Sequence, residues 1–75
     1  MNKVQRAKIQ DIISELEAQA SALDNLKEEE VEKYDNLPEN LQGSSQAERF
    51  QETADALEQC VDDLNSLIDS LNDLL

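Results

Sequence analysis

The chemically functional groups that recur with regular spacing in this sequence are acidic side chains. Between residues 48 and 73 they occupy two neighbouring rows of a predicted helix. The first row contains Glu48, Asp55, Asp62 and Asp69, and the second contains Glu52 and Asp73. Successive members of the first row would stand about 10.5 Å apart along the helix. This acidic ridge is either a solvated outer face or a surface that imitates phosphates toward a nucleic-acid-binding protein. Asp55, Glu58 and Asp62 would repel one another at spacings of three and four residues, which favours a functional role.

The residue types needed for most catalytic and metal sites are missing. Without histidine, the chain has no Ser-His-Asp arrangement, no His-ligated zinc and no Glu-x-x-His di-iron site. One cysteine excludes a thiolate cage within the chain, and one glycine excludes a phosphate-binding loop. We therefore expect no enzymatic activity, no cofactor and no metal.

Cys60 is the only cysteine, so it forms no disulfide within the chain. Its place in a heptad row favours a small packing residue, because free cysteines are often buried. The alternatives are a disulfide between two copies and a reactive thiol. A catalytic thiol is disfavoured because the chain has no histidine to act as its base.

The formal net charge of −12 limits the choice of partners. It repels nucleic acid and anionic membranes, so we expect no direct binding to either. Proteins remain, especially basic or nucleic-acid-binding ones. The sequence contains no apolar run long enough to span a membrane and no signal-peptide core, which predicts a cytoplasmic protein. The one basic cluster, Lys3, Arg6 and Lys8, is where a sequestered phosphate-bearing ligand would bind.

A heptad pattern between residues 50 and 75 must position the acidic ridge. Apolar residues recur at the two alternating seam positions: Phe50, Ala54, Leu57, Val61, Leu64, Ile68, Leu71 and Leu75. This pattern packs one helix against another. A third row lies beside the seam and contains Cys60, Leu67 and Leu74, with Thr53 at its start. Three apolar rows suit a helix that is covered on two sides, so we expect the third row to be a self-association or partner face.

The first helix is predicted over about residues 2–35, with apolar residues at spacings of three and four. One face contains Ile9, Ile12, Ile13, Leu16, Ala20, Leu23 and Leu26. Further along, we expect the apolar stripe to move to Val31 and Tyr34, with Gln19 and Lys27 as interruptions. Such drift is typical of a straight helix with 3.6 residues per turn.

The end of the first helix contains an acidic run from Glu28 to Glu32 between Lys27 and Lys33. A solvated helix face is the simplest interpretation, and a metal or basic-partner site is the alternative. Glu29 and Lys33 have the spacing and orientation of a favourable ion pair on a helix.

The turn is predicted over about residues 36–45 and the second helix over about residues 46–75. Pro38 ends the first helix near Asn36 and is expected to open a short helical turn that Gly43 closes. Leu37 and Leu41, the apolar residues of this segment, are expected to cover the end of the hairpin. Ser45-Gln46-Ala47-Glu48 has the pattern of a capping box.

These features predict one all-α domain over residues 1–75, an antiparallel two-helix hairpin with coiled-coil-like packing. A linker of this length normally returns the chain antiparallel. It would bring Lys3, Arg6 and Lys8 close to Asp62, Asp63, Asp69 and Asp73. The third apolar row predicts a homodimer that forms a four-helix bundle.

The segment from Tyr34 to Leu41, followed by Ala54-Asp55-Ala56-Leu57-Glu58, resembles small acidic helical-hairpin proteins of phages and phage-derived regions of bacterial genomes. The resemblance implies a hairpin fold and a phage context, and it implies no active site. The leading hypothesis is a non-enzymatic interaction module that self-associates. The alternatives are an acidic decoy that inhibits a host nucleic-acid-binding or defence protein and, third, a sponge for a small ligand.

Overall fold

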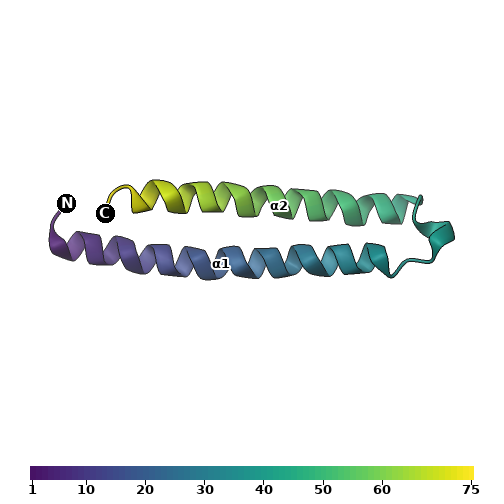
Figure 1. The fold of residues 1–75 in the computed structure, drawn as a ribbon, viewed down its shortest axis with the longest axis horizontal. Coiled ribbons are helices and arrows are strands. Elements are labelled where there is room, and N and C mark those ends of the chain that lie inside the picture. Colours follow the sequence, from purple (N-terminus) through teal and green to yellow (C-terminus); the bar gives the residue numbers. More distant parts are fainter.

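The computed structural model describes all of residues 1–75 and shows two long helices folded back on each other (Figure 1). Helix α1 spans Lys3–Asp35, helix α2 spans Ser45–Asn72, and one turn of 3-10 helix, η1, spans Glu39–Leu41. The two chain ends lie at the same end of the hairpin. The predicted all-helical hairpin is therefore confirmed, with α2 ending at Asn72 rather than at the last residue.

The start of α1 is capped by a reciprocal pair of side chains. The Asn2 Oδ1 accepts a hydrogen bond from the Gln5 backbone N–H at 2.8 Å, and the Gln5 Oε1 accepts one from the Asn2 N–H at 3.1 Å. Two of the four unpaired N–H groups at the helix start are thus satisfied. The sequence analysis missed this capping box, although the Asn-x-x-Gln pattern is its signature.

The turn follows the expected path through Pro38. Helix α1 ends at Asp35 with Asn36 as its C-cap, and the Leu41 N–H donates to the Pro38 carbonyl at 2.8 Å to form η1. Gly43 does not close this turn in the left-handed conformation, because its φ is not positive. Leu37 is half-buried at the end of the hairpin, whereas Leu41 is mostly exposed, so only Leu37 covers it.

Helix α2 begins one residue earlier than predicted. The Ser44 hydroxyl accepts a hydrogen bond from the Ala47 N–H at 3.2 Å, which makes Ser44 the N-cap. Ser45 is therefore the first helical residue, and the predicted capping box between Ser45 and Glu48 does not form. Ala47 is completely buried below this cap, so the burial of Ala47 fixes the position at which the helix starts.

The heptad seam of α2 faces α1, as its spacing predicts. Ala54 and Ile68 are buried. The other seam positions up to the end of the helix are half-buried: Phe50, Leu57, Val61, Leu64 and Leu71. Leu75 lies beyond the helix and is 45% exposed, so the seam ends at Leu71.

The seam of α1 keeps its heptad spacing, contrary to the predicted drift. Its residues are Ile9, Ile13, Leu16, Ala20, Leu23, Lys27, Glu30 and Tyr34, and all are buried or half-buried. Lys27 therefore lies within the seam and does not displace it, while Val31 is exposed at its edge. The long aliphatic stem of lysine permits this, because it can lie along apolar surface while its ammonium group reaches water.

The hairpin is long and thin, with principal extents of 60 × 14 × 11 Å. Five of its residues are buried, and Ile13 is the one large side chain that is fully covered. The chain exposes 5498 Å², about 800 Å² more than the roughly 4,700 Å² expected for a compact protein of its mass. Neither helix is sufficiently apolar along its length to cross a membrane.

Candidate interaction surfaces

The third heptad row of α2 is open to solvent along the whole helix. Leu67 is 50% exposed and Leu74 is 52% exposed. Cys60 is a free, exposed thiol, so α1 does not bury it as a packing residue. The hairpin by itself therefore leaves this row uncovered.

The equivalent row of helix α1 alternates apolar and polar residues, Ile12, Gln19, Leu26 and Lys33, and sequence analysis assigned its two apolar members to the seam. Ile12 is 45% exposed and Leu26 is 49% exposed. Both lie one residue before a seam residue, Ile13 and Lys27 respectively, which is the same heptad position that Cys60 and Leu67 occupy on α2. Leu74 continues this row in the turn that follows Asn72, the last residue of α2. The signal was available, because a strict seven-residue repeat from Ile13 leaves Ile12 outside the seam.

The two exposed rows lie on the same side of the hairpin. Positions just before and just after the seam flank it on opposite sides of each helix. In an antiparallel pair, equivalent flanking positions of the two helices face the same way, because one helix is inverted relative to the other. Ile12, Leu26, Cys60, Leu67 and Leu74 thus form one surface, the apolar side.

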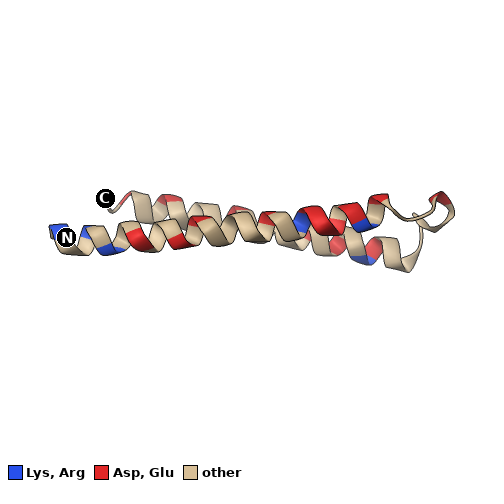
Figure 2. Cartoon of the chain, turned by 90° about the horizontal axis from the view of Figure 1, so that it is seen from below, with Lys and Arg blue, Asp and Glu red and all other residues tan.

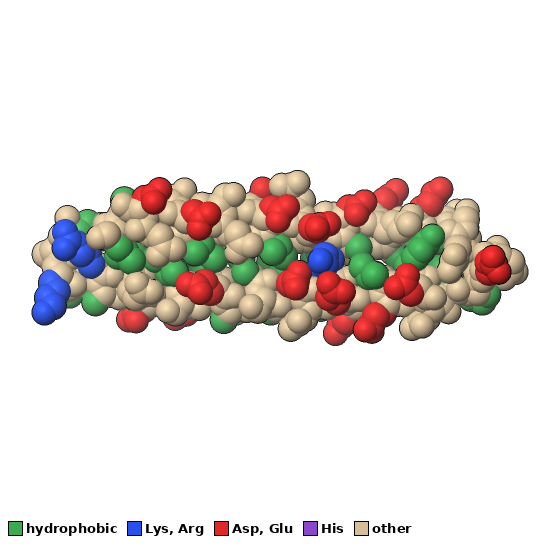
Figure 3. All heavy atoms as spheres, viewed as in Figure 1, with side chains coloured by type: hydrophobic (Ala, Val, Ile, Leu, Met, Phe, Trp, Pro, Cys, Tyr) green, Lys and Arg blue, Asp and Glu red, His purple; other side chains and the backbone are tan.

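The opposite side of the hairpin, the polar side, is defined by two shallow cavities that both helices line. One lies midway along the molecule and is lined mostly by polar residues: Glu17, Ala20, Ser21, Asp24, Asn25, Val61 and Asn65. The positions just after the seam on this side are polar except for Val31. The face in Figure 3 shows hydrophobic side chains in a line between rims of mostly acidic and other polar groups.

The acidic ridge lies on the outside of α2. All six of its residues are exposed, namely Glu48, Glu52, Asp55, Asp62, Asp69 and Asp73. No ion pair involves any of them, because the three ion pairs of the chain all lie within α1. Figure 2 shows acidic residues along both helices, and basic residues both at the start of α1 and among the acidic residues near the turn.

The basic cluster at the start of α1 does not build a site. Lys3, Arg6 and Lys8 are all exposed. They lie at the same end of the hairpin as the end of α2, but they form no ion pair with it. Neither cavity includes any of the three. A metal site is also absent, since no three acidic or thiol groups lie close enough to hold an ion.

Negative charge is concentrated near the turn. Residues 24–58, the turn half, contain eleven acidic and three basic side chains, a net charge of −8. Residues 1–23 and 59–75, the terminal half, contain seven acidic and three basic side chains, a net charge of −4. The turn half is thus the stronger attractor for a cation.

Two lysines of the turn half are held by neighbouring carboxylates. The Lys27 Nζ lies 3.4 Å from both the Asp24 Oδ1 and the Glu28 Oε1. Hydrogen bonds to Asp24 first and Glu28 second raise the pKa of Lys27 above its ordinary value. Lys33 pairs with Glu30 at 2.8 Å, not with the predicted Glu29.

The hydrogen bond to Glu30 likewise raises the pKa of Lys33. Its ammonium group also lies 5.9 Å from the centroid of the Phe50 ring, within cation–π range. The Glu30 carboxylate in the seam therefore directs Lys33 toward α2, which explains why the pair forms at a spacing of three residues.

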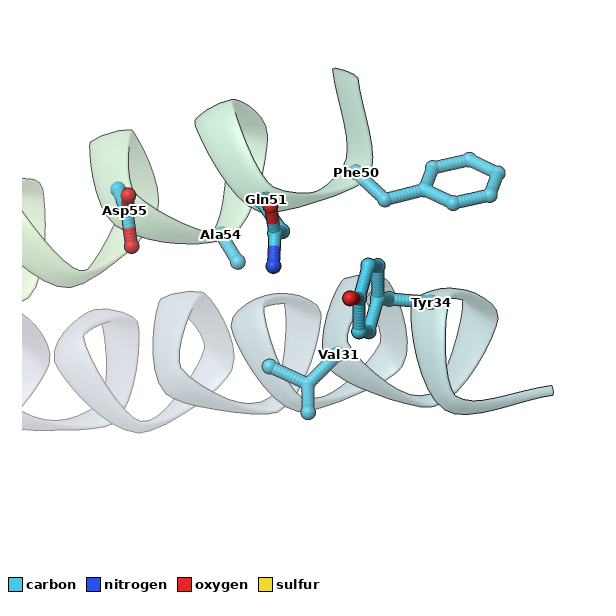
Figure 4. A pocket seen from close by; sticks show the side chains of 6 residues that line it. All are labelled: Val31, Tyr34, Phe50, Gln51, Ala54 and Asp55. Atoms are coloured by element: carbon cyan, nitrogen blue, oxygen red, sulfur yellow. The ribbon is translucent and has the colours of Figure 1, made fainter. Parts of the chain in front are cut away.

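An aromatic pocket lies on the polar side of the turn half (Figure 4). It has a volume of about 330 Å³ and is lined by Val31, Tyr34, Phe50, Gln51, Ala54 and Asp55. Sequence analysis placed five of these residues in the seam, the stripe and the ridge without bringing them together, and it assigned no role to Gln51. No sequence signal joins them, because the pocket depends on how the two helices are aligned.

Comparisons with known proteins identify no relative. No protein-family model, no curated protein and no solved structure matches this chain.

Proposed function

We propose that this protein is a non-enzymatic interaction module that dimerises through its apolar side into a four-helix bundle. The observation that carries the proposal is the asymmetry between the two sides of the hairpin. Apolar residues of both helices lie half-exposed on one side, while the other side is polar. Self-association follows because a second copy presents the same apolar surface, and a two-fold axis lets one patch cover its equivalent.

The exposed area is adequate for such an interface. The hairpin exposes about 800 Å² more than a compact protein of its mass. A standard protein–protein interface buries about 800 Å² on each partner. Dimerisation through the apolar side would therefore reduce the exposed surface of each chain to about that of a compact protein with the mass of one chain.

The alternative, a decoy that imitates DNA, is less well supported because the charge is sparser than that of duplex DNA. The net charge of −12 along 60 Å corresponds to one negative charge per 5 Å of a single hairpin, and to one per about 2.5 Å of a dimer with the hairpins side by side. Duplex DNA has one per about 1.7 Å of helix axis. The acidic ridge is better explained as the solvated outer face of the dimer. The resemblance to phage-encoded hairpins adds a context to the proposal, an accessory protein of a phage or phage-derived region.

Sedimentation equilibrium tests dimerisation directly. We expect the wild-type chain to be a dimer at micromolar concentration, with a Tm that rises with protein concentration. The double variant Leu67→Glu/Leu74→Glu should be monomeric, because it places charge at the centre of the apolar side. A wild-type chain that stays monomeric and fully helical at 100-fold higher concentration would overturn the proposal.

The polar side provides a matched control. The double variant Asn65→Glu/Asn72→Glu adds the same charge at exposed positions of the same helix, on the opposite side. It should remain dimeric. Loss of the dimer in both double variants would mean that net charge, not the apolar side, controls association.

A further inference from the structure

We propose that the aromatic pocket is an anchor site for an arginine side chain of a protein partner. This inference rests on the proposed role as an interaction module, but not on dimerisation. The pocket lies on the polar side, so an apolar-side dimer leaves it open. At about 330 Å³ it is at the lower end of ligand pockets, a size suited to one long side chain.

The lining combines an aromatic wall, an apolar floor and a polar rim. Figure 4 shows the Tyr34 ring standing across the gap toward α2, with Val31 on the same helix and Ala54 on the other. The Gln51 amide points from α2 toward α1, and Asp55 lies beyond Ala54, at the opposite end of the pocket from Tyr34. An aliphatic stem would lie against Val31 and Ala54, and a cationic end would meet the ring and the carboxylate.

The polar groups of this rim have no partner within the chain. Asp55 forms no ion pair, and neither the Gln51 amide nor the Tyr34 hydroxyl forms a side-chain hydrogen bond. The nearby cations Lys27 and Lys33 are already paired with carboxylates of α1. The pocket therefore has the groups that bind a cation, and no cation of the chain forms an ion pair with Asp55.

Charge favours a cationic occupant over a neutral or anionic one. The pocket lies in the turn half, where the net charge is −8. Of the two aromatic residues that line the pocket, Phe50 already has a cation within cation–π range, because the Lys33 ammonium group lies over its ring. The Tyr34 ring offers a second aromatic face to a cation from outside.

Arginine fits this lining better than lysine. Its planar guanidinium group stacks on an aromatic ring and donates two parallel hydrogen bonds to a carboxylate. Lysine presents a compact, strongly hydrated charge that gains less from a ring face. An arginine in the pocket would stack on Tyr34 and donate to Asp55, and the Gln51 carbonyl oxygen would accept a further N–H.

Tyr34 makes the test direct, because it is the only tyrosine and the chain has no tryptophan. The probe is the capped tripeptide Gly-Arg-Gly, titrated to millimolar concentration while NMR shifts and tyrosine fluorescence are recorded. We expect saturable shifts at Tyr34, Gln51 and Asp55. The citrulline tripeptide, which keeps the shape and loses the charge, should bind at least about tenfold more weakly. The lysine tripeptide should bind more weakly than the arginine one.

Two variants separate the pocket from general charge attraction. Asp55→Asn should weaken binding about fivefold, while Asp69→Asn, which removes a carboxylate from the same row of the ridge, should leave it unchanged. Tyr34→Phe should keep binding, because the ring remains. Equal weakening by Asp55→Asn and Asp69→Asn, or shifts spread along the whole ridge, would overturn the proposal.

Sedimentation of the same samples keeps the two proposals distinct. Asp55→Asn should remain dimeric, and the dimer-breaking variant Leu67→Glu/Leu74→Glu should still bind the arginine tripeptide. A dimer without saturable arginine binding refutes the anchor site alone. A monomer that binds arginine refutes dimerisation alone.

Discussion

In the terminal half of the hairpin the seam between the helices consists of aliphatic side chains, whereas in the turn half the same seam contains Lys27 and Glu30. The terminal half has a net charge of −4 and the turn half −8. Four of the five residues of the apolar side also belong to the terminal half: Ile12, Cys60, Leu67 and Leu74. Apolar packing therefore stabilises one half, and paired charges and an aromatic cluster occupy the other.

The two halves of this short hairpin thus differ in what their seams can contribute to the fold. Aliphatic layers contribute free energy without specifying a single alignment, whereas a polar residue in the seam specifies the alignment at a cost in stability. Lys27 occupies such a position, and its two carboxylate partners lie on its own helix. The aromatic pocket lies in the half where packing is less complete and charge is denser.

The largest effect should come from a charge in the aliphatic seam. Leu64→Asp should abolish folding, because truncating a core Leu alone costs about 2–5 kcal/mol and a chain of this size has only about 3–5 kcal/mol of stability. Circular dichroism should show loss of helicity. Ser66→Asp, which adds the same charge at an exposed position, should stay helical. A helical Leu64→Asp protein would contradict the seam.

In the turn half we expect a smaller effect, an increase in stability. Lys27→Leu should raise the Tm by on the order of 5 °C, because it replaces a half-buried charge in the seam with an apolar side chain. Thermal unfolding measures this change. Lys8→Leu, at an exposed position of the same helix, should leave the Tm almost unchanged. A lower Tm for Lys27→Leu would mean that its ion pairs outweigh the apolar burial.

The helix cap at the turn allows a third comparison. Ser44→Ala should cost about 1 kcal/mol, because it leaves the Ala47 N–H without its acceptor. Ser45→Ala should be close to neutral, since Ser45 makes no capping bond. Urea unfolding of the two variants distinguishes them. A larger loss of stability in Ser45→Ala than in Ser44→Ala would instead support the predicted capping box between Ser45 and Glu48.

The smallest effect concerns alkaline pH and is confined to the turn half. The pKa values of Lys27 and Lys33 are raised above the ordinary 10.5 by their carboxylate partners. Because the pKa of each lysine is higher in the folded state, its charge stabilises the fold fully at pH values below the ordinary pKa. This stabilisation is lost as the pH rises through the pKa of the folded state. The Tm should therefore fall above pH 10.5, and less so in Lys27→Leu. The same fall in that variant and in wild type would exclude Lys27 as a contributor.

Local sequence patterns were sufficient for the elements of this fold. The heptads of α2, the apolar spacing of α1 and the break at Pro38 predicted two helices and a turn, because each depends on neighbours within a few residues. The exposure of Cys60, Leu67 and Leu74 also followed, since one partner helix covers only two rows. The cap at Ser44 was missed by one residue, because the burial of Ala47 determines where the helix starts.

The seam of the terminal half could therefore be predicted from the sequence alone, whereas the seam of the turn half depends on the tertiary structure. The seven-residue repeats from Ile13 and Leu16 reach Lys27 and Glu30, but charged residues do not indicate burial by themselves, so only the packing of α2 shows that they are half-buried. The same packing brings Tyr34, Gln51 and Asp55 into one pocket, and it places the exposed apolar residues of both helices on one side. Sequence spacing assigns each residue to a row of its own helix, and only the packing of two helices determines which rows meet.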